Sequence, residues 1–360
     1  MLGRCYNIKS GCPKVKGLEH KQANRIFRCL KLLVRSQNLR IKSRKTVKLS
    51  LFLAFSFFCS ISIFAESKTD SPKTGVSLVV LGVAQDAGYP QLNCYRPHCM
   101  AGWENYDKRR LATSLAIIDK SNKEKFLFEA TPDIKEQLYR LHLLAPDYEY
   151  KLAGIALTHA HMGHYTGLMH LGKEAAGAKS VAVFAMPRMV EFLSNNGPWD
   201  QLVALKNINL RELSNLKETR LNSSVSIVPL LVPHRDEYTE TVGYKIIGPN
   251  KTALFIPDID KWKNWSTNIV ELVQKVDYAF LDATFFSSSE LPNRDMSEVP
   301  HPSVPESMKL FADLDEKDKQ KIIFIHFNHS NALLLEESAA QQEVVDKGFR
   351  FATEGMRIDL

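Results

Sequence analysis

Cysteine is scarce in this chain, and only two of its six cysteines, Cys94 and Cys99, lie beyond residue 65. Glycine and proline are too few, at 17 and 16, for a collagen-like or low-complexity protein. At 360 residues, the chain is also too long for a small scaffold held together by disulfides. Its 44% of hydrophobic and 24% of charged residues are typical of a globular protein with a full core.

Acidic residues are almost missing from residues 1–48, which hold 14 lysines and arginines but a single acid, Glu19. The rest of the chain holds 33 bases and 39 acids, so the net charge of +7 divides into +13 for this leader and −6 for the remainder. A surface that binds nucleic acid needs positive charge. Because the positive charge lies in the leader, we expect no nucleic-acid partner for the body of the protein.

Long hydrophobic runs are missing as well, apart from one between Leu49 and Phe64. Lys45 and Lys48 precede this run and the small residue Ala65 follows it, which is the pattern of a cleaved signal peptide. The run of about 16 residues is shorter than the roughly 20 that a membrane-spanning helix needs. The sequence therefore predicts a secreted or periplasmic protein with no stable membrane span after cleavage.

These features divide the chain into four segments. We expect a basic leader over residues 1–48, the hydrophobic region of the signal peptide over 49–65, a polar linker over 66–75 and one domain over 76–360. The leader is long for the charged region of a signal peptide. We interpret it as an over-extended gene start, because a start near Val47 would give a signal peptide of ordinary length.

Short apolar runs alternate with helical patterns along residues 76–360. β-Branched runs bounded by turn residues predict strands, and apolar residues at a spacing of three or four predict helices. Strands are expected over 76–85, 114–119, 125–130, 152–158, 180–186, 224–234, 243–248, 252–259, 278–286 and 321–327. Helices are expected over 133–144, 168–177, 187–196 and 307–314, followed by a polar helical tail. Strands separated by helices, without a repeat or an internal linker, indicate a single layered α/β domain.

Three histidines follow directly on one apolar strand. His159, His161 and His164 lie in LTHAHMGHYTGL, immediately after the strand residues IAL. Side chains two positions apart at a strand end point the same way, and the turn into a helix can bring the third imidazole to the same place. Imidazole binds Zn, Fe, Ni and Cu, so the spacing predicts a metal site at this strand end.

The histidine pattern resembles the metallo-β-lactamase-fold hydrolases, whose first motif is HxHxDH at the end of a strand. His234 in LLVPHRDEY, Asp258 in TALFIPDID and His326 in IIFIHFNHS follow in the order of that family's later metal ligands. The resemblance covers about residues 76–335 and implies an αββα sandwich, with two mixed sheets and helices on the outer faces. Within the family, the segments GVAQDAGYPQLNC, FLDATFF and FIHFNHSN look most like the branch of the pyrroloquinoline-quinone biosynthesis proteins B.

The resemblance also implies a role for each matching residue. It places His159, His161 and His234 around a first metal, Asp258 between two metals, and His164 with His326 on the second. Asp258 and His326 are the implied catalytic residues.

One position departs from the family pattern, because Gly163 stands where HxHxDH has its aspartate, a ligand of the second metal. We therefore expect one firmly bound Zn²⁺, with the second position, and Fe or Mn in place of zinc, left open. Asp260 and Asp282 are interpreted as turn residues or as partners of the ligands. Asp86, after the first strand, is interpreted as a turn residue that could face the metal. His301, in a proline-rich loop, is interpreted as a surface residue, with an approach to substrate as the alternative.

The two late cysteines lie in NCYRPHC and resemble a separate, structural zinc site of some relatives. That site has the pattern CxCxxC and a histidine three residues after the last active-site histidine. Arg96 replaces the middle cysteine here, so Cys94, His98, Cys99 and His329 would form the tetrahedral set. A disulfide and free thiols stay open as alternatives, because a separation of five residues permits each of them.

A metal ion held by imidazoles, with one open position, makes hydroxide available near neutral pH. The chain has no GxSxG motif that would supply a serine nucleophile. We therefore expect an exported metal-dependent hydrolase that attacks an ester, lactone or phosphodiester bond of a small molecule. A role in pyrroloquinoline-quinone biosynthesis with iron-dependent oxidative chemistry, and a non-catalytic metal-binding protein, are the alternatives. The substrate and the oligomeric state stay open.

Overall fold

The structure is a computed structural model, of which residues 75–291, 295 and 298–360 are described. The predicted leader over 1–48, the signal-peptide region over 49–65 and all of the linker except Gly75 lie outside these residues. Residues 69–360 form one structural unit by themselves. In the part of the chain that the structure describes, no helix has the length and apolar character required to cross a bilayer.

Seven strands form the first sheet, in the order β14-β1-β2-β3-β4-β5-β6. They are β1 (Val76–Gly82), β2 (Ser114–Asp119), β3 (Glu124–Phe128), β4 (Lys151–Ala156), β5 (Val181–Ala185), β6 (Ile208–Glu212) and β14 (Arg357–Asp359). The sheet is mixed, because β14 to β3 pair antiparallel and β3 to β6 pair parallel. Every residue of β1 and β2 is buried, which is expected of strands covered on both faces.

Seven more strands form the second sheet, in the order β13-β12-β11-β10-β9-β8-β7. They are β7 (Thr219–Arg220), β8 (Ser226–Leu231), β9 (Val242–Ile247), β10 (Thr252–Ile256), β11 (Tyr278–Asp282), β12 (Ile322–Ile325) and β13 (Arg350–Phe351). This sheet is also mixed, since β7 to β10 pair antiparallel and β10 to β13 pair parallel.

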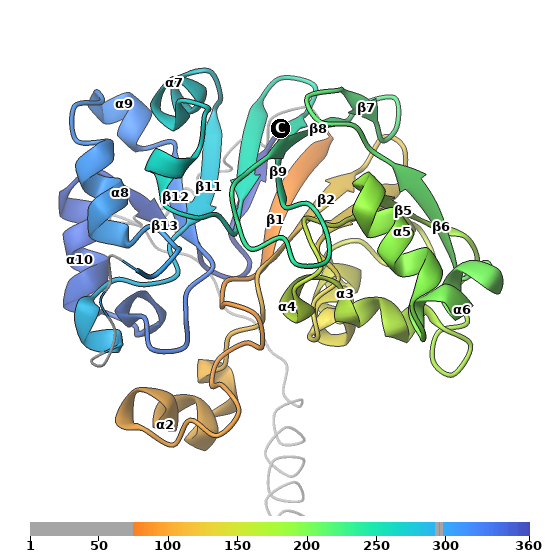
Figure 1. The fold of residues 1–360 in the computed structure, drawn as a ribbon, viewed down its shortest axis with the longest axis horizontal. Coiled ribbons are helices and arrows are strands. Elements are labelled where there is room, and N and C mark those ends of the chain that lie inside the picture. Colours follow the sequence, from red (N-terminus) through yellow and green to blue (C-terminus); the bar gives the residue numbers. More distant parts are fainter. Residues whose placement is uncertain (1–74, 292–294, 296–297) are drawn as a thin grey trace, which may run out of the picture. The chain divides into compact units, whose positions relative to one another are not determined.

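Helices lie on the outer side of each sheet, as Figure 1 shows. Beside the first sheet are α3 (Ile134–Leu144), α4 (Met162–Tyr165), α5 (Pro187–Asn195) and α6 (Trp199–Ala204), and beside the second are α7 (Ile269–Gln274), α8 (Val304–Leu310), α9 (Glu316–Lys319) and α10 (Ala339–Asp346). Helix α2 (Pro97–Glu104) belongs to the connection between β1 and β2. The 3₁₀ helices are η1 (Tyr106–Lys108), η2 (Thr166–Leu171), η3 (Trp262–Asn264), η4 (Ser288–Glu290) and η5 (Ala332–Leu334).

The two sheets face each other across a shared core, and a second core lies under the helices of the first sheet. Neighbouring residues of β1 belong to different cores, Leu78 to the one between the sheets and Val79 to the one under α3 and α5. Between the sheets, the ring of Phe128 contacts Tyr244 and Phe255, with ring centroids 5.7 and 6.0 Å apart. The predicted αββα sandwich is thus confirmed.

Two expected elements differ from the structure. The predicted helix over 168–177 was wrong, because the chain there forms the 3₁₀ helix η2 and then turns. Gly172 and Gly177, the latter with φ of +53°, lie within that segment, and glycine favours turns over a helix interior. The expected polar helical tail contains α10, but the chain continues into β13 and β14, and β14 pairs with β1.

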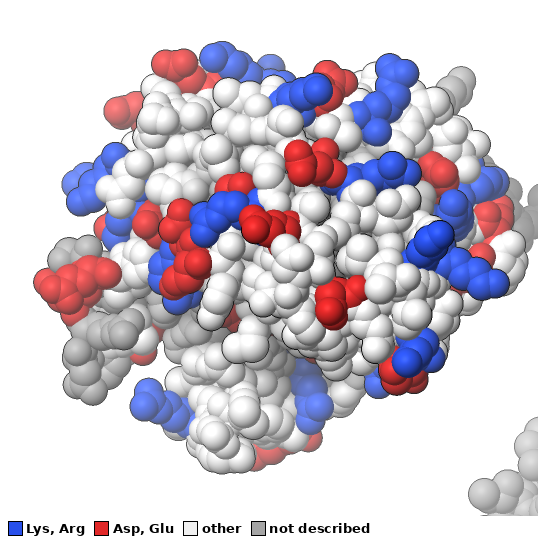
Figure 2. All heavy atoms as spheres, turned by 45° about the vertical axis from the view of Figure 1, so that its right-hand side comes forward, with Lys and Arg blue, Asp and Glu red and all other residues white. Residues whose placement is uncertain are grey.

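One face of the molecule carries charges of both signs. Figure 2 shows lysine and arginine side chains interspersed with aspartate and glutamate over this face, without a continuous basic patch.

Candidate metal centre

The carboxyl ends of several strands carry the side chains of one buried cluster. His159 follows β4 by three residues, Asp258 follows β10 by two, and His326 comes directly after β12. Strands β3 and β4 run parallel in the first sheet, as do β10, β11 and β12 in the second. Parallel strands end at the same edge of a sheet, where ligand sites of α/β proteins commonly lie. The topology therefore gathers residues that are far apart in the sequence.

The first group of the cluster consists of His159, His161, His234 and Asp258. Their ligand atoms all lie within 4.8 Å of one another. Nε2 of His159 and Nδ1 of His161 are 3.4 and 3.9 Å from Oδ2 of Asp258, and Nε2 of His234 is 3.2 Å from Oδ1. The structure thus brings together the four residues that the sequence assigns to a first metal.

Each of the three imidazoles of this group is held through its other ring nitrogen. The hydroxyl of Thr158 lies 2.8 Å from Nδ1 of His159, Oδ1 of Asp260 lies 3.2 Å from Nδ1 of His234, and Oε2 of Glu237 lies 3.3 Å from Nε2 of His161. Partners of this kind fix the tautomer and the orientation of histidines that bind metals. Asp260 therefore has the role expected of a partner of a ligand.

The second group consists of Asp86, His164 and His326, whose ligand atoms also lie within 4.8 Å of one another. Nε2 of His164 is 3.4 Å from Oδ1 of Asp86. On the far sides of the rings, Oε1 of Glu129 is 3.3 Å from Nδ1 of His164, and the Thr284 hydroxyl is 3.0 Å from Nδ1 of His326. Burial lowers the pKa of His164, but Glu129 and Asp86 outweigh it and hold this pKa well above its usual value.

The atoms that face the middle of the cluster are buried and have no hydrogen-bond partner. They are Nε2 of His159, His164, His234 and His326 together with Oδ1 of Asp86 and Asp258. Buried polar atoms in proteins are nearly always hydrogen-bonded, so a convergent set without partners needs a reason. Imidazole nitrogens and carboxylate oxygens are ligands of Zn²⁺ and of other divalent transition metals. The donor set therefore fits a metal ion.

The ionisation of Asp258, His159 and His326 suits metal binding, which requires neutral imidazoles and ionised carboxylates. Burial raises the pKa of Asp258, but the neighbouring His234 and His301 outweigh it and hold this pKa well below its usual value. Burial lowers the pKa of His159 and of His326. Burial acts in the same direction on His234, but Asp258 outweighs it and the pKa of His234 is instead raised.

His301 belongs to this site, and its expected position at the surface was wrong. It is 7% exposed, and its Nδ1 lies 2.9 Å from Oδ2 of Asp282 and 3.2 Å from Oδ1 of Asp258. Burial lowers the pKa of His301, but the two carboxylates outweigh it and raise this pKa to about 9. Two residues after His301, Ser303 forms a capping box with Glu306 at the start of α8. The pattern of Ser303 followed three residues later by Glu306 is the signal in the sequence that could have shown that the loop beside His301 is fixed to a helix start.

The sequence model of the beta-lactamase superfamily domain matches residues 124–327, which is more than half of the chain. The chain belongs to the beta-lactamase superfamily. The matched segment contains all of the cluster except Asp86, which precedes it.

Two curated relatives share most of the length of the chain. It is similar to coenzyme PQQ synthesis protein B from Gluconobacter oxydans, with 26% identity over 308 residues, which cover 79% of this chain and 99% of that protein. The protein of the same name from Methylobacterium sp. (strain 4-46) is 26% identical over 305 residues, which cover 78% of this chain and 99% of that protein. The likeness of the sequence to this branch of the superfamily is thereby confirmed.

Solved structures of the superfamily share the fold. A Zn²⁺-bound PqqB from Methylobacterium extorquens matches with a TM-score of 0.67 and 21% identity, covering 79% of this chain and all of that one. A diphosphatase of the PhnP family matches with a TM-score of 0.55 and 20% identity, covering 79% of this chain and 97% of that one. Identities this low establish the shared architecture alone.

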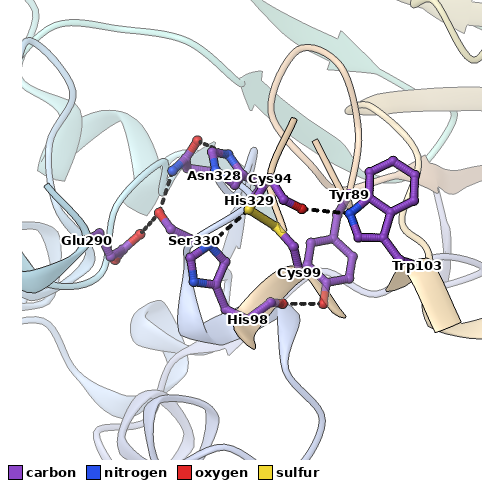
Figure 3. The surroundings of a disulfide bond; sticks show 9 residues. All are labelled: Tyr89, Cys94, His98, Cys99, Trp103, Glu290, Asn328, His329 and Ser330. Atoms are coloured by element: carbon purple, nitrogen blue, oxygen red, sulfur yellow. Dashed lines mark hydrogen bonds between the residues drawn. A yellow bond between two sulfur atoms is a disulfide. The ribbon is translucent and has the colours of Figure 1, made fainter. Parts of the chain in front are cut away.

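A separate cluster contains the two late cysteines. Ligand atoms of Cys94, His98, Cys99 and His329 lie within 4.8 Å of one another, so the structure brings the four predicted residues together. The two sulfurs form a disulfide, one of the alternatives that the sequence leaves open (Figure 3). Nε2 of His98 lies 3.4 Å from Sγ of Cys94. Zinc is bound by thiolates rather than by disulfide sulfurs, so zinc at this cluster stays a prediction for the reduced cysteines.

Proposed function

We propose that this chain is a metal-dependent hydrolase that cleaves an ester, lactone or phosphodiester bond of a small molecule. The observation that carries the proposal is the convergence of four buried Nε2 atoms and two carboxylate oxygens that have no hydrogen-bond partners. A divalent ion at such a site supplies hydroxide at neutral pH, by lowering the pKa of bound water to about 7, and polarises the bond to be broken.

Two side chains are placed to move protons in this reaction. Asp258 reaches both groups of the cluster and is the acceptor for a proton of the attacking water. His301, fixed through Nδ1 by Asp282, leaves its Nε2 to donate a proton to the departing oxygen. The reaction consumes one water, whose oxygen bonds to the acyl carbon or the phosphorus as the bond to the departing oxygen breaks. The proton taken up by Asp258 restores the one lost from His301, so the protein ends unchanged.

The exposure of the cluster indicates the side from which a substrate enters. The side chains of His161 and Asp86 are 15% and 42% exposed, whereas those of His159, His164 and Asp258 are exposed by 3% or less. A substrate would therefore approach between the segments that carry His161 and Asp86. The excess of acids over bases beyond residue 48 supports a small molecule rather than a nucleic acid as substrate.

A second candidate is a role like that of coenzyme PQQ synthesis protein B. The similarity to such proteins over 99% of their length supports it. In that case the same imidazoles would hold iron, and oxygen would be consumed, since histidine suits Fe as well as Zn.

We also propose that the protein is exported, on the basis of the charged and apolar pattern before residue 66. N-terminal sequencing of protein from cells tests this. Export predicts a mature N-terminus just after Ala65, whereas an intact N-terminus in the cytoplasm would contradict it.

Elemental analysis of the purified protein, beside a screen of phosphodiester, lactone and ester substrates, tests the proposed activity. We expect turnover of at least one class that a chelator abolishes and that zinc restores. The double variant His159→Ala, His161→Ala is the control, since it should turn over none. Bound iron with oxygen uptake and no hydrolysis would favour the second candidate. Metal uptake with neither reaction would indicate a binding protein.

A further inference from the structure

The second group of the cluster contains a carboxylate from an unexpected part of the chain. We infer that Asp86, from the loop after β1, supplies the carboxylate ligand of a second metal position, in place of the aspartate that the HxHxDH pattern would put at residue 163. The inference rests on the metal centre of the proposed function and adds a ligand to it.

The space beside Gly163 shows why this chain has no side chain at that position. A Cβ atom at Gly163 would lie 2.4 Å from Cα of Asp86 and 2.9 Å from its Cβ. Real Cβ atoms do not approach other carbons so closely, so a side chain at 163 and the present position of the Asp86 loop exclude each other. The absence of a side chain at Gly163 therefore leaves the space that Asp86 occupies.

The Asp86 carboxylate faces the second group with one oxygen, Oδ1. Although 42% of its side chain is exposed, its Oδ1 is buried and has no hydrogen-bond partner. The same oxygen lies 3.4 Å from Nε2 of His164, an atom that is likewise buried and without a partner. That Nε2 is also 3.7 Å from Oδ2 of Asp258, so the second position adjoins the first and shares Asp258 with it.

The backbone fixes the Asp86 loop next to the other ligands. The amide of Gln85 donates a 2.7 Å hydrogen bond to the carbonyl of Phe327, the residue after His326. Asp86, Glu129 and His326 have φ values of +40°, +77° and +70°. Left-handed backbone at residues other than glycine costs free energy and collects at functional sites. These three residues surround the ring of His164, so the strain is concentrated at the second group.

The ligands of the second metal position, with Asp86 among them, are of the same chemical types as a set that contains the HxHxDH aspartate. Asp86, His164, His326 and the shared Asp258 offer two imidazole nitrogens and two carboxylate oxygens, a set that suits Zn, Mn or Fe. The Asp86 side chain is 42% exposed, so the second metal position adjoins solvent. An incoming substrate oxygen would reach this second position first.

Metal binding to the purified protein tests the inference. The protein is stripped with a chelator and titrated with Zn²⁺ by calorimetry, and the bound zinc is then counted by elemental analysis. With the Cys94–Cys99 disulfide kept oxidised, so that the cysteine cluster binds no zinc, we expect two equivalents for the wild type. Asp86→Asn, which keeps the shape but removes the charge, should bind one, with the second dissociation constant raised at least about 100-fold. Asp236→Asn removes an equal charge from a side chain that is 71% exposed and should still bind two.

Gly163→Ala gives a second route to the same result. The added methyl group would lie 2.4 Å from Cα and 2.7 Å from Oδ1 of Asp86, so it displaces the loop and its carboxylate without removing the charge, and this variant should also drop to one equivalent. Circular dichroism shows whether each variant is folded. Two equivalents of unchanged affinity in folded Asp86→Asn, or a single equivalent in the wild type, would overturn the inference. These readouts count ions only, so an absence of turnover with two ions bound would contradict the proposed function and leave Asp86 as a ligand.

Discussion

Two sets of side chains with metal-binding chemistry lie in one domain, and they differ in what their donor atoms contact. In the histidine cluster, defined by the two groups above, the facing Nε2 atoms have no hydrogen-bond partner. In the cysteine cluster of Cys94, His98, Cys99 and His329, the two sulfurs are bonded to each other. The sequence spacing favours a metal at both places. The contacts of the donor atoms separate them, because a donor that already has a partner is not ready for an ion.

The clusters differ in their outer contacts too. Carboxylates lie behind the imidazoles of His164 and His234, and buried hydroxyls lie behind His159 and His326. In the cysteine cluster, Nδ1 of His329 is 3.1 Å from the Asn328 amide oxygen, a neutral partner on the adjacent residue. The rings of His164, His234 and His326 are held from behind by other segments, and such rings bind a metal with little loss of conformational freedom. Thr158 behind His159 is, like Asn328, the adjacent residue.

The largest effect is expected from removing two ligands of the first group. The double variant His159→Ala, His161→Ala should bind its metal at least about 100-fold more weakly, and activity should fall with it. The variant should stay folded, because the lost side chains face the centre rather than the hydrophobic cores. Elemental analysis and circular dichroism measure the two properties. His142→Ala, at a side chain that is 37% exposed, is the control, and unchanged metal content in the double variant would refute the ligand assignment.

A smaller effect is expected at a residue that only positions a ligand. Asp260→Asn leaves His234 in place but weakens the hydrogen bond to its Nδ1, so metal affinity should fall about tenfold. Glu237→Gln makes the same change behind His161, but Glu237 is 53% exposed and its loss should matter less. Calorimetric titration with zinc ranks the two variants. If both variants lowered zinc affinity equally, or if neither lowered it, the partners behind the imidazoles would not distinguish the histidine cluster from the cysteine cluster.

The cysteine cluster should respond to redox conditions and the histidine cluster should not. Under oxidising conditions, Cys94→Ser, Cys99→Ser should lower the free energy of unfolding by about 2 kcal/mol, since a disulfide that closes so short a loop contributes about that much. Under reducing conditions, the wild type should bind one zinc more than this double variant. Denaturant titrations and zinc assays in both buffers measure these differences. Equal zinc in the reduced proteins would reject the structural zinc site and leave the disulfide as the role of these cysteines.

The smallest effect concerns the stability of the protein at acidic pH. Burial lowers the pKa of His98, with Arg96 adding to it, and burial lowers the pKa of His329, with His98 adding to it. Below an unfolded-state pKa of about 6.5, the unfolded chain therefore binds more protons than the folded one. Stability contributed by these neutral rings is present above that pH and is lost as the pH falls toward the folded-state values. His98→Gln, His329→Gln should make the unfolding free energy fall less between pH 7 and pH 5, and a steeper fall would contradict this.

The sequence predicts the histidines of the site because they follow strand ends in a compact pattern. It offers Asp86 only as a turn residue that could face the metal, and His301 as a surface residue, so it establishes neither as a member of the cluster. Asp86 looks like a turn residue, since nothing local shows that the loop after β1 ends beside Gly163. His301 lies in a loop whose burial depends on its pairing with Asp282, which comes from another strand. Contacts that arise only when distant segments close on each other carry no periodic signal.

The difference between local patterns and contacts of distant segments also decides which parts of the fold the sequence predicts. Long apolar runs with clear bounds, such as those of β1 and β2, are predicted correctly because their pattern is local. Strand β14, with three residues, is too short for a pattern of its own and is defined by its pairing with β1. The segment over 168–177 has apolar residues at helical spacing, but its glycines favour turns, and the structure follows the glycines.

The most direct test of the metal centre is anomalous scattering at the zinc edge from crystals of the zinc-loaded protein. We predict a strong peak about 2.0 to 2.2 Å from Nε2 of His159 and of His234 and from a carboxylate oxygen of Asp258. A map with no peak there, and with water molecules hydrogen-bonded to those imidazoles instead, would contradict the account.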